Sequence, residues 1–306
     1  MPPECGLSSG KPVFFEKSQI FPISAPEAMQ TVLTIAGFDP SSGAGVTADL
    51  MVFAAHGLFG TACITGLTVQ STVGVRSVHP TSASLVRETL DCLHADLPPT
   101  GVKLGMLSSI DNIRVICAYL EQLREIHEDG KRVVIVCDPV LRSSSGRELI
   151  DPAGVDVVRE RLLPLVDWVT PNLDELALLS GQSVSRREDM ADACRKLQGH
   201  IAGVKGSKLL GIIATGGHLN PPDDLLLTPG GEECWLPGKQ VATRSTHGTG
   251  CAFSSAFLGR LVLGDSPIEA AQAAKTYVSE ALRTAVARGK GNGPLNLLGP
   301  LLESGQ

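Results

Sequence analysis

The stretch STHGTGCAFSSAFL, residues 245 to 258, carries the strongest structural signal in this chain. Its glycines Gly248 and Gly250 allow a tight backbone turn, and the small and apolar residues after them predict a buried helix that starts near Cys251. Free N–H groups and the positive dipole end of a helix start favour a phosphate or a developing negative charge. The same field lowers the pKa of a thiol. The stretch therefore predicts an anion site, with Cys251 as a candidate proton acceptor.

Five further motifs precede this stretch. They are IAGFDPSSGAGVTAD (35–49), VKLGML (102–107), CDPV (137–140), TPNLDE (170–175) and GGH (216–218). In this order, and with cysteine rather than aspartate at 251, they resemble the hydroxymethylpyrimidine and phosphomethylpyrimidine kinases of thiamine biosynthesis, a branch of the ribokinase superfamily. The resemblance covers about residues 31–298. It implies a ribokinase-like three-layer α/β/α sandwich with a mainly parallel central sheet.

Composition is that of an ordinary globular enzyme. The chain has 306 residues, 43% of them hydrophobic and 19% charged, enough for a large core in one domain. A net charge of −6 without long basic runs argues against nucleic acid as a partner. The eight cysteines form no C-x-x-C pair, which fits a reducing cytoplasm, and no zinc-binding histidine spacing occurs.

The N-terminal region differs from the rest. Residues 1–30 mix Pro, Ser, Glu and Lys with short apolar breaks, and we expect them to form a partly ordered arm ahead of a kinase domain over residues 31–306. Neither a signal peptide nor a membrane span can be built from this arm, so we expect no membrane association.

Short β-branched runs alternate with helical patterns along the domain. Strands are expected near 31–36, 62–70, 101–105, 132–137, 166–169 and 210–214. Helices are expected between most of them, with clear amphipathic spacing near 44–56 and 267–287. A hairpin is expected within 223–242, close to a nucleotide pocket. Such alternation predicts a parallel sheet covered on both faces, with ligands at the carboxyl ends of the strands.

The phosphates of a nucleotide need an anion site, and the G-x-x-x-x-G-K-[ST] loop is absent. The resemblance places this site in the loop Gly248, Thr249, Gly250 and Cys251, whose backbone N–H groups stabilise the transferring phosphoryl group. It also makes Cys251 the base that accepts the proton of the substrate hydroxyl. Without the resemblance, Cys251 reads as a buried thiol at a helix start.

Metal and nucleotide residues follow from the next motifs. Asp138 ends an apolar strand and Glu175 opens a helix, and such carboxylates position Mg²⁺ and ATP together with the phosphates. Read without the resemblance, Asp138 before proline is a turn, and Asn172 with Glu175 is a capping box. The resemblance adds Asn172, Thr215, Gly217 and His247 to the nucleotide site.

One departure from the family pattern concerns residue 215. The resembled kinases carry lysine where this chain has Thr215, and that lysine contacts the ATP phosphates. Another cation, such as Lys103, Arg142 or Arg244, could replace it. The departure bears on nucleotide affinity and rate more than on the fold.

The acceptor side is assigned to four residues. The resemblance implies that Asp49 and Gln70 bind the aminopyrimidine, because a carboxylate and an amide satisfy its ring nitrogens and exocyclic amine. It also places Met106 as an apolar wall against the ring, beside Gly37 of the first motif. For Met106, plain core packing is the competing interpretation.

The expected activity is ATP-dependent phosphorylation of 4-amino-5-hydroxymethyl-2-methylpyrimidine and then of its monophosphate. A pyridoxal or pyridoxine kinase is the first alternative, although cysteine at 251 argues against it. A non-catalytic vitamer-binding protein is the second, and Thr215 is the feature that supports it. The sequence does not decide between a monomer and a homodimer.

Overall fold

The computed structural model describes residues 29–125, 132–142, 149–150, 152–204, 209–217 and 219–299. Within them lies a nine-stranded sheet in the order β3-β2-β1-β4-β5-β6-β7-β8-β9. The strands from β2 to β7 in this order run parallel, and β3, β8 and β9 are added antiparallel at the two edges. The predicted N-terminal arm lies almost entirely outside the described residues.

The strands have these bounds: β1 (Thr31–Phe38), β2 (Phe59–Ser71), β3 (Gly74–Pro80), β4 (Gly101–Leu104), β5 (Val134–Cys137), β6 (Trp168–Val169), β7 (Gly211–Ala214), β8 (Asp224–Leu227) and β9 (Glu233–Leu236). The six expected parallel strands are confirmed, as is the hairpin, which is β8 and β9. The strand β3 was not expected.

The helices are α1 (Gly45–Ala55), α2 (Ala83–Asp96), α3 (Ile110–Glu125), α4 (Pro152–Val157), α5 (Leu173–Ser180), α6 (Arg187–Ala202), α7 (Thr249–Val262) and α8 (Pro267–Arg283). A π-helical turn, η1 (Val158–Leu162), and a 3₁₀ turn, η2 (Leu163–Leu165), follow α4. No helix among the described residues is long and apolar enough to cross a membrane.

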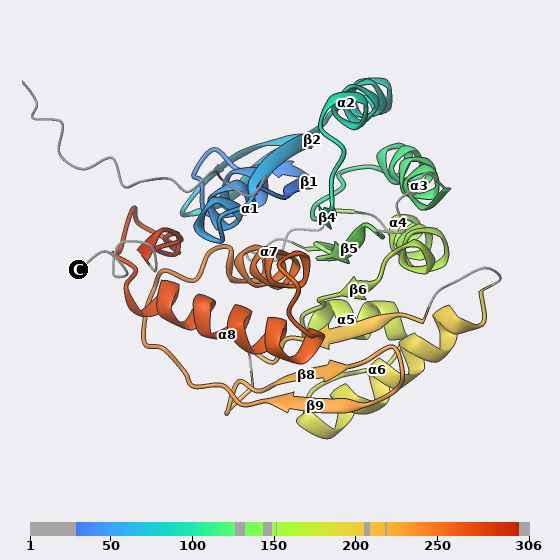
Figure 1. Ribbon diagram of the computed structural model, residues 1–306. Helices are drawn as coiled ribbons and strands as arrows, with labels where there is room; N and C mark the ends of the chain where they lie inside the picture. Colours follow the sequence, from blue (N-terminus) through green and yellow to red (C-terminus); the bar gives the residue numbers. More distant parts are fainter. Residues whose placement is uncertain are drawn as a thin grey trace, which may run out of the picture.

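The helices form two layers around the sheet, which Figure 1 shows edge-on. One layer, α1, α7 and α8, packs its apolar side chains on one face. The other layer, formed by α2 to α6, covers the opposite face. Strand β1 is buried on both sides, as a central parallel strand requires. The predicted three-layer α/β/α sandwich is confirmed.

Helix α7 differs from the other helices because its own residues are apolar or small on every side of the helix. Ala252 through Gly259 are all buried. A helix without a polar face is stable only inside the protein, and α7 lies between α1 and α8 while touching β4 and β5. Its N-terminus is thereby fixed at the centre of the molecule.

Candidate active site

Residues predicted for the site gather where the central strands end, and all but Met106 are polar. Met106 follows β4, Asp138 follows β5, Asn172 follows β6 and Thr215 follows β7. The carboxyl ends of parallel strands share one edge of a sheet and commonly hold ligands. The start of α7, at Thr249, faces this edge, because the Cβ position of Gly250 lies 3.6 Å from Asp138 Oδ2.

The turn into α7 depends on glycine at 248. This residue has φ +89°, and a Cβ atom on it would lie 1.8 Å from the carbonyl oxygen of Gly43. An alanine would therefore meet both backbone strain and a clash. The N–H groups of Thr249, Gly250 and Cys251 belong to the first turn, where a helix offers them no acceptor. Their placement suits the predicted anion site.

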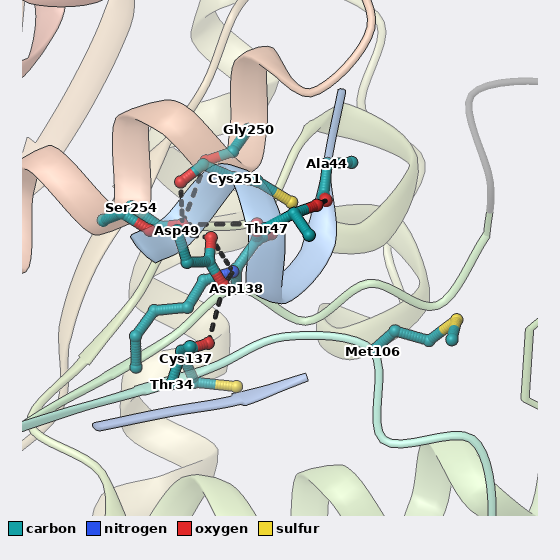
Figure 2. A network of polar contacts seen from close by, with 12 residues as sticks. Thr34, Ala44, Thr47, Asp49, Met106, Cys137, Asp138, Gly250, Cys251 and Ser254 are labelled. Carbon is teal, nitrogen blue, oxygen red and sulfur yellow. Dashed lines mark hydrogen bonds and ion pairs between the residues drawn. The ribbon is translucent and has the colours of Figure 1, made fainter. Parts of the chain in front are cut away.

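The thiol of Cys251 lies in a polar cluster at the start of α7 (Figure 2). Asp138 lies close enough to the thiol for its charge to raise the pKa of Cys251. Ser254, one turn further along α7, donates a hydrogen bond to Asp138 Oδ2, at 3.3 Å. Asp138 is therefore joined to the helix that carries the predicted anion site.

The sequence prediction of a lowered thiol pKa is wrong for the unliganded protein. Burial raises the pKa of Cys251 to about 12, Lys103 opposes this shift, and the carboxylates of Asp138 and Asp49 add to it. The predicted decrease of the thiol pKa took account only of the local backbone dipoles at the helix start. Desolvation, which depends on the tertiary fold, is the larger effect here.

Asp49 forms a buried ion pair instead of lining an open pocket. Lys103 Nζ lies 3.0 Å from both of its carboxylate oxygens. Thr34 donates to Oδ2 at 2.6 Å and Ser255 donates to Oδ1 at 2.8 Å. Both oxygens are thus occupied and the side chain is fully buried. This geometry does not support the prediction that Asp49 binds the pyrimidine.

Lys103 remains charged in this setting. Burial alone would lower the pKa of its ammonium group, but Asp49, followed by Cys251 and Asp138, raises it above the ordinary value. Because Lys103 is fully buried and held by Asp49, it does not replace the family lysine at the phosphates. That expectation for Lys103 is wrong.

Asp138 and Glu175 are close enough to affect each other. Burial raises the pKa of Asp138, and burial together with the charge of Asp138 raises that of Glu175. Glu175 also completes the capping box of α5: its Oε2 accepts from the N–H of Asn172 at 3.0 Å, and Asn172 Oδ1 accepts from the N–H of Glu175 at 3.0 Å. The capping interpretation is confirmed. For Asp138, the opposing charge of Lys103 does not offset the effect of burial.

Beside Thr215, a residue predicted for the nucleotide, lies a group of polar contacts that the sequence did not reveal. Thr215 pairs in parallel with Asn172 and Gly217 lies in the turn after β7. The N–H of Gly216 donates to Asp224 Oδ1 at 2.9 Å, and Lys275 Nζ lies 2.6 Å from Asp224 Oδ2. Lys275, rather than Lys103, is therefore a cation linked to the loop at Thr215.

Two contacts define the acceptor side. Met106 packs against Gly37 so closely that a Cβ atom on Gly37 would lie 2.2 Å from Met106 Cε. In Figure 2, Met106 lies apart from the cluster around Asp138 and Cys251. Gln70 Nε2 lies 2.9 Å from His247 Nε2, so Gln70 is joined to the residue just before the anion loop. His247 thus contacts Gln70, a residue predicted for the acceptor, although the sequence analysis assigned His247 to the nucleotide.

Sequence reasoning missed the contacts of Ser254, Ser255 and Lys103, and that of Asp39, whose Oδ2 lies 2.7 Å from His247 Nε2. The two serines were interpreted as helix packing, although both lie one turn past Cys251. Ser254 donates a hydrogen bond to Asp138, and Ser255 donates one to Asp49. A lysine inside the apolar run VKLGML was the available signal for a buried ion pair, since a buried ammonium needs a partner.

The fold and this site define a ribokinase-like small-molecule kinase. Residues 39–296 match the family model described as phosphomethylpyrimidine kinase. The chain is 37% identical to a hydroxymethylpyrimidine/phosphomethylpyrimidine kinase of Staphylococcus aureus, over 89% of this chain and 95% of the relative. The chain therefore belongs to the phosphomethylpyrimidine kinase family.

Two further relatives place the chain more widely. It is 37% identical to the thiamine biosynthesis bifunctional protein ThiED of Geobacter sulfurreducens, over 92% of this chain but only 55% of that longer protein. Among solved structures, an ADP complex of Bacillus subtilis pyridoxal kinase aligns with a TM-score of 0.76 and 28% identity, covering 90% of this chain and 100% of the other. These matches confirm the ribokinase-like fold and identify the chain as a kinase.

Proposed function

We propose that this kinase transfers the γ-phosphoryl group of ATP to 4-amino-5-hydroxymethyl-2-methylpyrimidine, and then a second phosphoryl group to the monophosphate. The observation that carries the proposal is the start of α7, which brings Gly250 and Cys251 next to Asp138 at the carboxyl edge of the sheet. The names of the family and of the Staphylococcus aureus relative support this substrate class.

In the first transfer, the substrate hydroxyl oxygen attacks the γ-phosphorus, the O–H bond breaks and its proton passes to the thiolate of Cys251. The bond from the γ-phosphorus to the bridging oxygen breaks, and ADP leaves with that oxygen. The N–H groups of Gly250 and Thr249 stabilise the charge on the transferred group. Asp138 and Ser254 fix the helix start, because Asp138 accepts a hydrogen bond from the Ser254 hydroxyl.

Asp138 and Glu175 are the residues that we propose would hold Mg²⁺. Two buried acids, of which Asp138 raises the pKa of Glu175, gain from a cation between them and the phosphates. When bound, Mg²⁺ supplies positive charge to the phosphoryl oxygens. ATP is the proposed phosphoryl donor, supported by the ADP complex of the Bacillus subtilis pyridoxal kinase. Asn172, Thr215 and Gly217 are its proposed contacts.

A coupled assay for ADP release separates this function from the alternatives. The protein should release ADP with the hydroxymethylpyrimidine and much less with pyridoxal, and a no-acceptor control measures background hydrolysis. Faster turnover of pyridoxal would make the chain a pyridoxal kinase. Binding of the pyrimidine by calorimetry with no ADP release would favour the vitamer-binding alternative.

Two further proposals concern the cellular location and the oligomeric state of the enzyme. The seven described cysteines are free thiols, which supports a reducing cytoplasm. Exposed apolar side chains along β2 and the turn after it, among them Leu67, Val69 and Val73, support a homodimer through this part of the surface. Sedimentation of the protein, with Leu67→Asp as the perturbed variant, tests the dimer.

A further inference from the structure

Three side chains from distant parts of the chain form one line of hydrogen bonds. His247 Nε2 lies 2.7 Å from Asp39 Oδ2 and 2.9 Å from the amide nitrogen Nε2 of Gln70, an amide whose nitrogen and oxygen exchange places by a half-turn. Asp39 follows β1, Gln70 lies near the end of β2 and His247 precedes α7. The line therefore connects the proposed pyrimidine-binding amide to a buried carboxylate on another loop.

The imidazole at the centre of this line has little freedom to move. A Cβ atom on Gly43 would lie 2.3 Å from His247 Cδ2, so the ring packs directly on the backbone of the loop after β1. The backbone N–H of His247 donates to the carbonyl of Gly293 at 3.1 Å. With ring and backbone both held, the same nitrogen must face Asp39 and Gln70.

Asp39 is an anion in this arrangement. Burial alone would raise the pKa of its carboxyl, but hydrogen bonds from His247 and Ser41 outweigh burial and lower it. Both the N–H and the hydroxyl of Ser41 donate to Oδ1, at 2.8 and 2.7 Å, and the N–H of Ala44 donates to Oδ2 at 3.1 Å. A carboxylate only accepts hydrogen bonds. Hence Nε2 of His247 carries the hydrogen and donates it to Asp39.

The proton on Nε2 decides how the amide of Gln70 is turned. A nitrogen that carries hydrogen repels the NH₂ group of an amide and attracts its oxygen, and the two ends of a glutamine amide exchange by a half-turn. We infer that Asp39, acting through His247, holds the Gln70 oxygen toward His247 and the NH₂ group away from it, which makes Gln70 a donor to a ring nitrogen of the substrate. Asp39 and His247 are thus positioning residues for substrate specificity.

This inference rests on the proposed function and makes it more specific. An NH₂ donor pairs with the lone pair of a pyrimidine ring nitrogen and not with the exocyclic amine, which is itself a donor. An analogue with C–H in place of that ring nitrogen should lose about 10- to 100-fold in kcat/KM, in line with one hydrogen bond to a buried group. An analogue with hydrogen in place of the exocyclic amine should lose much less in kcat/KM, because Gln70 does not bind that amine.

A double-mutant cycle tests the coupling between two residues that do not touch each other. Asp39→Asn lets either end of its amide face His247, so Gln70 loses its fixed orientation. We expect Asp39→Asn to lower kcat/KM for the pyrimidine about 10-fold or more, mainly through KM. In a Gln70→Leu background the same substitution should change kcat/KM less than about threefold. Equal losses in both backgrounds would show that Asp39 only supports its loop, and would overturn the inference.

A second measurement needs no enzymatic activity and reads out the wild-type protein. Nitrogen-15 NMR of the wild-type protein reports which ring nitrogen of His247 carries the hydrogen, with assignment by a His247→Gln spectrum. We expect the hydrogen on Nε2 near neutral pH, and an unprotonated Nε2 would overturn the inference. If wild type shows the protonated Nε2 but no pyrimidine phosphorylation, the proposed function fails while the orientation of Gln70 stands.

Discussion

The two phosphoryl transfers place different demands on Cys251, which gives a sharp prediction. The first acceptor is an alcohol that must lose a proton. The second is a phosphate monoester whose second pKa is about 6, so it is mostly ionised at pH 7. Only the first transfer needs a base. Cys251→Ala removes the thiol and keeps the backbone N–H of residue 251.

The structure sets the size of the pH effect. With the pKa of Cys251 at about 12, only about one thiol in 10⁵ is a thiolate at pH 7. Five pKa units correspond to roughly 7 kcal/mol for forming the base before substrate binds. Because the assay range lies wholly below this pKa, each pH unit upward raises the thiolate fraction about tenfold. The rate of the alcohol step should therefore rise with pH, and the monophosphate step should stay nearly flat above pH 7.

The assay follows each transfer alone, by chromatography of products from each acceptor between pH 7 and pH 9. For wild type, the ratio of the alcohol rate to the monophosphate rate should rise about tenfold per pH unit. Cys251→Ala should slow the alcohol step by roughly 10² to 10⁴-fold, slow the monophosphate step far less and abolish the pH dependence of the ratio. Cys251→Ser is the matched control for the shape of the side chain.

Equal losses in both steps of the alanine variant would contradict this reasoning. They would show that Cys251 acts through loop geometry or phosphate positioning. A ratio independent of pH in wild type would also refute the thiolate as base at its present pKa.

Three other substitutions have expected outcomes. Lys103→Met leaves the buried carboxylate of Asp49 unpaired and should lower the free energy of unfolding by about 3–5 kcal/mol in urea melts; a loss recovered by adding Asp49→Leu would support the ion pair, and a loss below about 1 kcal/mol would not. Thr215→Lys should tighten ATP binding in calorimetry through a charge-assisted contact, unless Lys275 already fills that role, in which case affinity stays flat. Gly248→Ala should reduce kcat by about 100-fold or more, because its Cβ would lie 1.8 Å from the Gly43 oxygen, and normal turnover would disprove the need for glycine in the anion loop.

Most of the fold could be predicted because its signals are local. Buried parallel strands read as short apolar runs, and α8 shows its amphipathic spacing and the capping box of Ser266 and Glu269. Strand β3, GVRSVHP, was missed because it is an edge strand whose residues are half-buried or exposed, so it lacks an apolar run. Its pairing with β2 is visible only in the tertiary structure.

The location of the candidate site could be predicted from the sequence, but the partner of each of its charged side chains could not. Parallel strands bring Asp138, Asn172 and Thr215 to one edge whatever their side chains do. Which neighbour a charged group then binds depends on the direction of each side chain, and Asp49 turned toward Lys103. The pKa of Cys251 was mispredicted for a similar reason, since burial comes from contacts far away in the sequence.

The central place of α7 has a consequence for synthesis of the protein. Its side chains Phe253 and Phe257 join the same apolar cluster as Val32, Val136 and Trp168 of the sheet. The ribosome synthesises α7 after most of the chain. The face of the sheet on which α7 packs therefore stays uncovered while the strands before it have already emerged. Vectorial folding then leaves an apolar surface open to aggregation until the last fifth of the chain emerges. Demand for chaperones during translation should therefore concentrate in that interval.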